Sequence, residues 1–282
     1  MAGQNVLHPF SRLNAPGIQF IRHILDDPKW LIKKYLLKLK SGKAGNRPFK
    51  ILDIGCGDFQ YLRNGHGRVS SVLSCPNIKV TLVDPKEISI PKSLQKKCFH
   101  YKGTFQEFFD KIQGSLSEKF DLIILSTVVH ELYLKWCLER VLRRKKDDDP
   151  VTESGRKIFC EDLFKKLMVL LNVDGYVLLV ENYYPKRITR DEQLFAREIQ
   201  FSQIGHADSP AAFFPTEEYV DAAEAVGFRC CKNDSVRCVN LGFLKTAIKS
   251  CKKEEAESAL TAFEGRRFGC KLFRIGEGGL GR

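Results

Sequence analysis

The stretch ILDIGCGDF, residues 51–59, is an apolar run that ends in two glycines one residue apart, with an acid on either side of them. An apolar run of this kind predicts a strand that is buried on both faces, here residues 50–54. Gly55 and Gly57 have no β-carbon, so the chain can turn tightly after the strand and a ligand can lie directly against the backbone. The stretch therefore predicts a strand that stops at a ligand site.

Four further apolar runs follow at intervals that leave room for helices between them. They cover residues 80–84, 98–103, 120–127 and 175–182. Apolar residues recur at helical spacing in residues 105–112, 128–144 and 159–171. Buried strands that alternate with helices predict a doubly wound α/β fold with a mostly parallel sheet.

The rest of the chain adds fewer elements. Thr216 and Gly227 are suited to begin and end a helix, and residues 228–239 and 270–275 are strand candidates. The charged segment 145–156 is expected to be a surface loop, because it contains one proline, one glycine and almost no apolar side chain.

The composition is that of a globular protein, with 43% hydrophobic and 28% charged residues among 282. No apolar run approaches the roughly 18 residues that span a bilayer, and the first residues do not resemble a secretory signal, so we expect a cytoplasmic protein. Ten cysteines occur without a CxxC pair or the Cys/His spacing of a zinc module. We therefore expect reduced thiols and no metal site.

The net charge of +12 is concentrated at the start of the chain, where residues 1–50 contain ten Lys or Arg against two acids. Residues 28–40 have the pattern of an amphipathic helix. We expect residues 1–47 to form a helical cap on a domain that covers residues 48–282, with residues 183–215 inserted as a lid. The basic helix either binds a polyanion or packs over the site with its lysines in water, and the second interpretation is favoured.

The acids around the glycine turn indicate the kind of ligand. A dinucleotide fingerprint, GxGxxG, would have its third glycine at position 60, which is Gln60. Asp84 ends the second strand, where a carboxylate can accept hydrogen bonds from both hydroxyls of a ribose. Asp53 suits a cation better than a pyrophosphate. A ligand with a ribose, an ammonium group and a positive centre but no phosphate is S-adenosylmethionine.

The motifs ILDIGCGDF, VTLVD, FDLIILSTVVHEL and DGYVLLVEN, taken in order, resemble the strand-end motifs of class I S-adenosylmethionine-dependent methyltransferases. The resemblance covers roughly residues 48–240 and implies a Rossmann-like fold and this cofactor. It also implies a cofactor site in four parts. These are the methionine end at Asp53, Gly55, Cys56 and Gly57, the ribose at Asp84, the adenine near Thr104 and Phe105, and the methyl group opposite Ser126 and Thr127.

The chain departs from the family pattern at two places. Asp53 and Asp84 are 31 residues apart, where about 20 is usual after a glycine turn. The family often has an acid for the adenine amino group directly after the third strand, and the sequence GTFQEF has none at once. Recognition of adenine is then expected to rely on Phe105 or on the backbone.

Two residues are candidates for the chemistry. Methyl transfer needs alignment above all, and a base only where the acceptor must lose a proton. His130, at the start of the helix after the fourth strand, is expected to be that base or a substrate ligand, the alternative being a bond to neighbouring backbone. Glu181, at the end of the fifth strand, either binds a substrate cation or forms a salt bridge to Lys186 or Arg187.

These observations predict an enzyme that transfers a methyl group to a small-molecule acceptor. The basic first fifty residues leave open methylation of RNA or protein. The missing adenine acid leaves open a non-catalytic protein that keeps the cofactor fold for interaction with partners.

Overall fold

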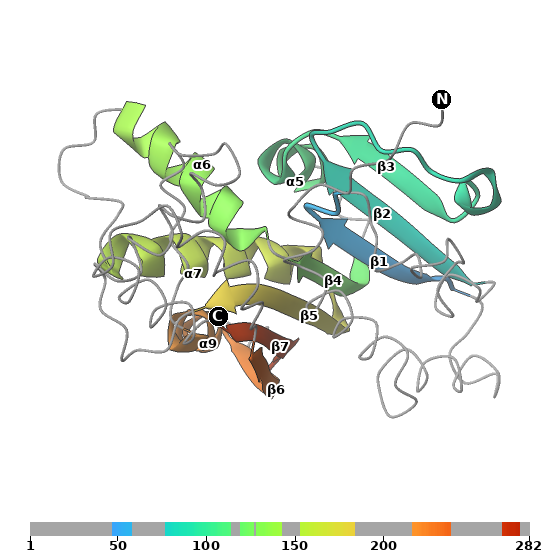
Figure 1. Ribbon diagram of the computed structural model, residues 1–282. Helices are drawn as coiled ribbons and strands as arrows, with labels where there is room; N and C mark the ends of the chain where they lie inside the picture. The colour runs from blue at the N-terminus through green and yellow to red at the C-terminus, as the bar shows by residue number, and fades with distance from the viewer. Residues whose placement is uncertain are drawn as a thin grey trace.

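The structure, a computed structural model, describes residues 47–57, 77–113, 119–126, 128–142, 153–183, 216–237 and 267–276. The expected cap (1–47, apart from Arg47), the lid and Thr127 lie outside these residues, except that Tyr183 ends a strand. The described residues form one sheet of seven strands in the order β3-β2-β1-β4-β5-β7-β6 (Figure 1). The strands are β1 (Phe49–Ile54), β2 (Ile78–Asp84), β3 (Cys98–Lys102), β4 (Phe120–Ser126), β5 (Leu171–Tyr183), β6 (Phe228–Arg237) and β7 (Arg267–Ile275).

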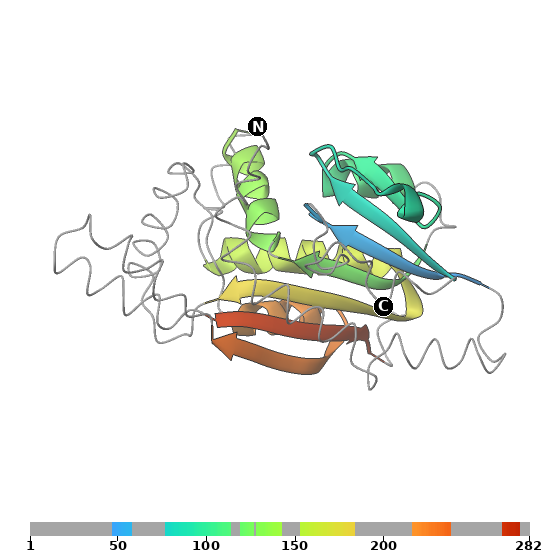
Figure 2. The same cartoon turned by 45° about the vertical axis from the view of Figure 1, so that its right-hand side comes forward.

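Strands β1 to β5 are parallel, and β7 lies antiparallel between β5 and β6 (Figure 2). The prediction of a doubly wound, mostly parallel sheet is confirmed. The chain proceeds from β1 to β2 and β3 on one side and returns to β4 and β5 on the other, so the strand order reverses between β1 and β4. In sheets of this type, ligands bind outside the carboxyl ends of the strands at that point.

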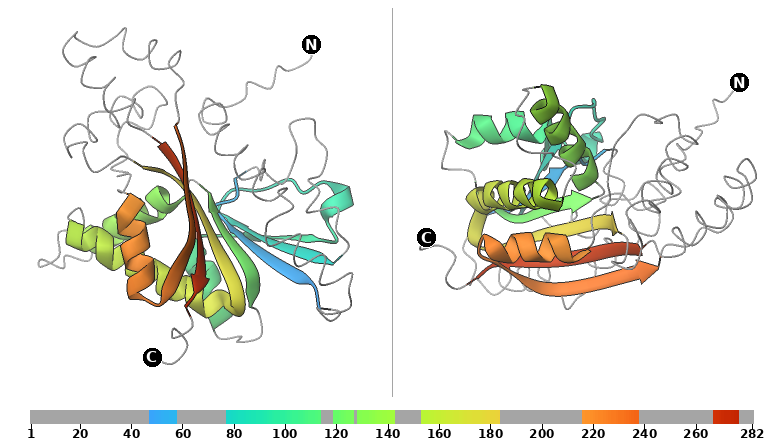
Figure 3. Two further views of the ribbon diagram at one scale, coloured as in Figure 1. Left: turned by 90° about the horizontal axis from the view of Figure 1, so that it is seen from below. Right: turned by 90° about the vertical axis from the view of Figure 1, so that its left-hand side faces the viewer.

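The described helices are α5 (Phe105–Gln113), α6 (Val129–Leu142), α7 (Glu153–Leu170) and α9 (Thr216–Ala225), with a short 3-10 helix η1 (Lys92–Leu94). Figure 3 shows α7 and α9 on the same side of the sheet. There Phe164 of α7 packs against Phe228 and Phe273 of the sheet, with ring centroids 5.6 and 5.1 Å away. No helix in the described part of the chain is long and apolar enough to span a membrane.

Both faces of the sheet are buried, as strands without a polar side predict. Leu52 and Ile123 belong to the core beneath the helices, and each is 0% exposed. Ile51, Leu82 and Ile124 have side chains on the opposite face and are also 0% exposed. Burial of both faces is typical of a parallel sheet.

The prediction of a surface loop at residues 145–156 is wrong at its end, because α7 begins at Glu153. Arg156 lies in the first turns of α7 and donates two hydrogen bonds to Glu218 of α9, each of 2.8 Å. The two side chains are only 17% and 18% exposed. A charged segment predicts exposure when no partner is visible nearby, and here the partner lies 62 residues further along the chain.

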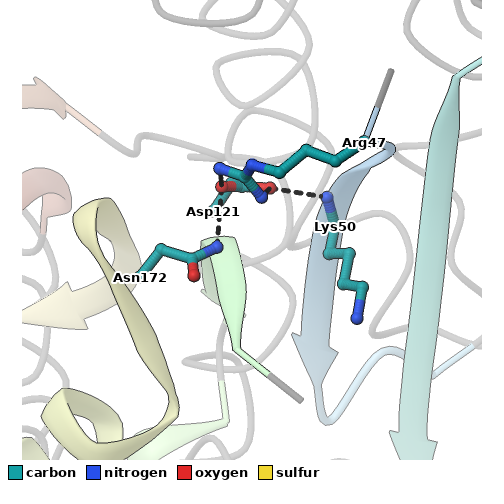
Figure 4. A network of polar contacts seen from close by, with 4 residues as sticks. All are labelled: Arg47, Lys50, Asp121 and Asn172. Atoms are coloured by element: carbon teal, nitrogen blue, oxygen red, sulfur yellow. Dashed lines mark hydrogen bonds and ion pairs between the residues drawn. The ribbon is translucent and has the colours of Figure 1, made fainter. Parts of the chain in front are cut away.

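The amino ends of three strands are joined by the carboxylate of Asp121 (Figure 4). Arg47 donates to both of its oxygens, over 2.6 and 3.2 Å. The backbone N–H of Lys50 in β1 and the side-chain amide of Asn172 in β5 add bonds of 2.9 and 2.8 Å. Because Asp121 is in β4, the network fixes β1, β4 and β5 relative to one another at the end of the sheet away from the glycine turn.

Candidate functional site

The turn after β1 requires two glycines for different reasons. Both have left-handed backbone angles, with φ of 65° at Gly55 and 49° at Gly57, a region that disfavours other residues. A β-carbon at Gly55 would lie 2.1 Å from Cγ2 of Val128, whereas a β-carbon at Gly57 would meet nothing within 4 Å. Gly55 therefore lets the turn close onto the residue before α6, and Gly57 borders open space where a ligand can approach. Cys56 between them is 5% exposed.

Asp84 connects this turn to the end of β2. Its Oδ2 accepts a 2.9 Å hydrogen bond from the backbone N–H of Gly57, and its Oδ1 accepts one of the same length from Lys86. A carboxylate has about four acceptor positions, so these two bonds leave capacity for the hydroxyls of a ligand. The bond to Gly57 was not predicted from sequence, because residues 27 apart had to be brought together.

Asp53 lies inside the protein rather than at the surface of the turn. Its side chain is 0% exposed and points to the face of the sheet opposite that of Leu52 and Ile54. Its contact with the methionine end of a cofactor stays a prediction.

The residues expected near adenine have structural roles. The hydroxyl and the backbone N–H of Thr104 donate to Glu107 Oε2 over 2.8 and 2.7 Å, and Thr104 Oγ1 accepts a 3.3 Å bond from the N–H of Glu107. This is a capping box at the start of α5. The Phe105 ring is buried in the core beside Phe109, with centroids 6.2 Å apart. Of the two expected modes of adenine recognition, the packing of Phe105 favours contact through the backbone.

The two candidate catalytic residues are in contact with each other. His130 is the second residue of α6, and its Nδ1 lies 3.1 Å from Oε2 of Glu181 in β5. The same oxygen accepts a 3.0 Å hydrogen bond from the backbone N–H of Val129. The side chains of His130 and Glu181 are 8% and 3% exposed. We call this pair the His130–Glu181 dyad.

The dyad has the arrangement of a general base and the group that orients it. A carboxylate only accepts, so the Nδ1 atom that bonds it has the proton, and in that neutral tautomer Nε2 is the basic nitrogen. The negative charge of Glu181 also lies at the amino end of α6, where the helix dipole favours it. Lys186 and Arg187, the alternative partners of Glu181, lie outside the described residues.

Packing places the dyad next to the glycine turn. Val128, which the turn of Gly55 closes onto, precedes His130 by two residues. Ser126, predicted to face the methyl group, ends β4 and is half-buried. The carboxyl ends of β1, β2, β4 and β5 thus contribute Gly57, Asp84, Ser126 and Glu181 to one edge of the sheet.

A scan against models of protein families found no match, and a comparison with the sequences of curated proteins found none either. Solved structures are similar in fold. The structure described as "Loganic acid methyltransferase with SAH" matches with a TM-score of 0.58 and 11% identity over 98% of both chains. "Geranyl diphosphate methyltransferase in complex with GPP and sinefungin" matches with a TM-score of 0.51 and 12% identity over 93% of this chain and 78% of that one. The chain has the Rossmann-like fold of S-adenosylmethionine-dependent methyltransferases.

Proposed function

We propose that this protein binds S-adenosylmethionine and transfers its methyl group to a small-molecule acceptor. The observation that carries the proposal is the carboxylate of Asp84, bonded to Gly57 of the turn after β1 and next to the point where the strand order reverses. A nucleoside needs a carboxylate with spare acceptor positions for its ribose and a backbone without a side chain for close approach. Asp84 and Gly57 meet both requirements.

The bound cofactor supplies a methyl group that is already activated by the sulfonium, so the chain has to bind, orient and remove a proton. Asp84 binds the ribose, and the turn at Gly55 and Gly57 holds the methionine end. Nε2 of His130 takes the proton of the acceptor, since Nδ1 is bonded to Glu181. Glu181 stabilises the imidazolium that forms and keeps the ring in one orientation.

The names of the similar structures support a small acceptor, because loganic acid and geranyl diphosphate are small molecules. The concentration of basic residues in the first fifty positions supports RNA or protein as a second class of acceptor. To separate these classes, the protein is incubated with methyl-labelled cofactor and a cell extract divided into metabolites, RNA and protein. Label in the metabolites is the expected result, and label confined to either polymer fraction would refute the small-molecule assignment.

Cofactor binding is tested by calorimetry with S-adenosylmethionine and its demethylated product. We expect Asp84→Asn to weaken binding about 10- to 100-fold, because a hydrogen bond to a charged group contributes roughly 1.5–3 kcal/mol. Asp174→Asn is the matched control, since that carboxyl side chain is 90% exposed at the other end of β5. Binding to neither compound, or binding that Asp84→Asn leaves unchanged, would contradict the proposal.

A second variant separates binding from folding. Gly57→Ala places a methyl group in the open space beside the turn, so it should weaken the binding of the cofactor more than it lowers the melting temperature. Heat of binding without methyl transfer to any fraction would instead support a non-catalytic cofactor-binding protein.

A further inference from the structure

Lys271 is a lysine buried in the sheet. It lies in β7, between β5 and β6, and is only 2% exposed. An ammonium group is costly to bury unless an anion lies beside it, so lysines are rarely buried this deeply without one. The position of Lys271 therefore raises the question of which buried carboxylate is its counterion.

The register of the sheet places Glu181 next to Lys271. Lys271 is directly opposite Leu179 of β5, and Glu181 is two residues further along β5, on the same face. Such diagonal neighbours are about 7–8 Å apart in an antiparallel pair, within reach of a lysine side chain. The residue directly opposite Glu181 is Gly269, which has no side chain to occupy the space beside the carboxylate.

The other buried acids in the described part of the chain are poorly placed. Asp53 is on β1, three strands away from β7, with its side chain on the opposite face of the sheet. Asp84 is on β2, farther still, and bonds the turn after β1. Asp121 is held by Arg47 at the far end of β4. Glu181 alone among them lies on a strand paired with β7.

The titratable groups of the helices on this face do not offer Lys271 another anion. Burial raises the pKa of the Tyr133 phenol in α6 and that of the Cys160 thiol in α7, so both are neutral. The Tyr219 side chain in α9 is a phenol and is also buried. Glu218 of α9 is bonded to Arg156 of α7 through both of its oxygens.

We propose that Lys271 is a positioning residue: its ammonium group is the counterion of the Glu181 carboxylate and so keeps His130 oriented through Nδ1. A buried carboxylate without a cation takes up a proton more readily. Protonated Glu181 could donate to His130 instead of accepting from it, which would reverse the tautomer and leave the wrong nitrogen basic. The orientation of His130 is a property of the chain itself, and only its catalytic consequence rests on the proposed function.

The orientation is measured by histidine-selective ¹⁵N NMR on the full chain without cofactor, with the signal of His130 assigned through His130→Gln. In the native protein we expect a protonated Nδ1 and an unprotonated Nε2 at pH about 8. Lys271→Met should shift both ¹⁵N signals toward a tautomer mixture, and Lys271→Arg should restore them. Arg274→Met is the control, because it removes an exposed cation from the same strand. Signals of His130 that Lys271→Met leaves unchanged would overturn the proposal.

Melting temperatures provide a readout that survives a weakly folded variant. Removal of one charge of a buried pair leaves the other uncompensated, whereas removal of both does not. Lys271→Met should therefore lower the melting temperature, and Lys271→Met combined with Glu181→Gln should recover about half of the loss or more. Losses that simply add would overturn the pairing.

Activity then tests the catalytic consequence. We expect Lys271→Met to lower kcat about tenfold or more with KM for the cofactor changed less than about twofold, and Lys271→Arg to restore most of kcat. A KM effect without a kcat effect would overturn the positioning role. Absence of methyl transfer in the native protein would refute the proposed function instead, and the NMR and melting results would still decide the role of Lys271.

Discussion

Gly55→Ala should destabilise the protein through a collision that the structure locates. The added β-carbon would lie 2.1 Å from Cγ2 and 2.6 Å from Cβ of Val128. Overpacking a closed site costs about 1–3 kcal/mol, and a left-handed backbone angle costs a non-glycine residue about 1–2 kcal/mol more. We therefore expect the free energy of unfolding to fall by about 2–5 kcal/mol.

Urea unfolding and the melting temperature measure this loss. About 2–4 °C is lost per kcal/mol in a domain of this size, so the melting temperature should fall by roughly 5–15 °C. Gly57→Ala is the matched control, because Gly57 has a similar left-handed φ but open space where the β-carbon would be. It should cost only the backbone term, about 1–2 kcal/mol.

A second substitution tests whether Val128 is the cause. Val128 is 5% exposed, and Val128→Ala alone should cost about 2 kcal/mol because it removes two buried methyl groups. Combined with Gly55→Ala it should relieve the collision, with a favourable coupling of about 1–3 kcal/mol. Equal losses for Gly55→Ala and Gly57→Ala, or strictly additive losses in the double variant, would refute the role of Val128.

Three further outcomes are expected. Arg156→Met should lower the free energy of unfolding by about 1–3 kcal/mol because it removes two half-buried hydrogen bonds to α9; Lys157→Met, at a side chain 68% exposed, should cost at most about 0.5 kcal/mol, and equal losses would contradict the argument. Burial raises the pKa of the Cys98 thiol to about 11, so iodoacetamide at pH about 8 should modify exposed Cys231 and spare Cys98 until the pH approaches 11 or urea is added, as mass spectrometry of the peptides will show. Hydrogen bonds from the backbone N–H and the hydroxyl of the residue that caps α5 lower the pKa of Glu107 below 4.5, so its advantage over Glu107→Gln in melting temperature should be complete above pH about 5 and disappear as the pH falls through the lowered pKa; an advantage that does not vary with pH would contradict this.

Much of the fold was predictable because its signals are local. An apolar run indicates a buried strand wherever its partners lie, and all seven strands overlap a run or candidate recognised in the sequence. Glycine angles are local as well, since Gly55 and Gly57 have the left-handed conformations that a tight turn requires. Gly227, with φ of 101°, ends the turn after α9 as predicted.

Only the tertiary structure brought distant residues into contact. The sequence indicated His130 and Glu181 separately, but their hydrogen bond joins residues 51 apart and depends on the pairing of β4 with β5. The insertion of β7 between β5 and β6, which buries Lys271 beside Glu181, likewise depends on strand order and register. Periodicity, caps and turns are set by neighbours along the chain, so they can be recognised in the sequence. Register and charge pairing are set by the packing of the whole sheet, so they appear only when the chain has folded.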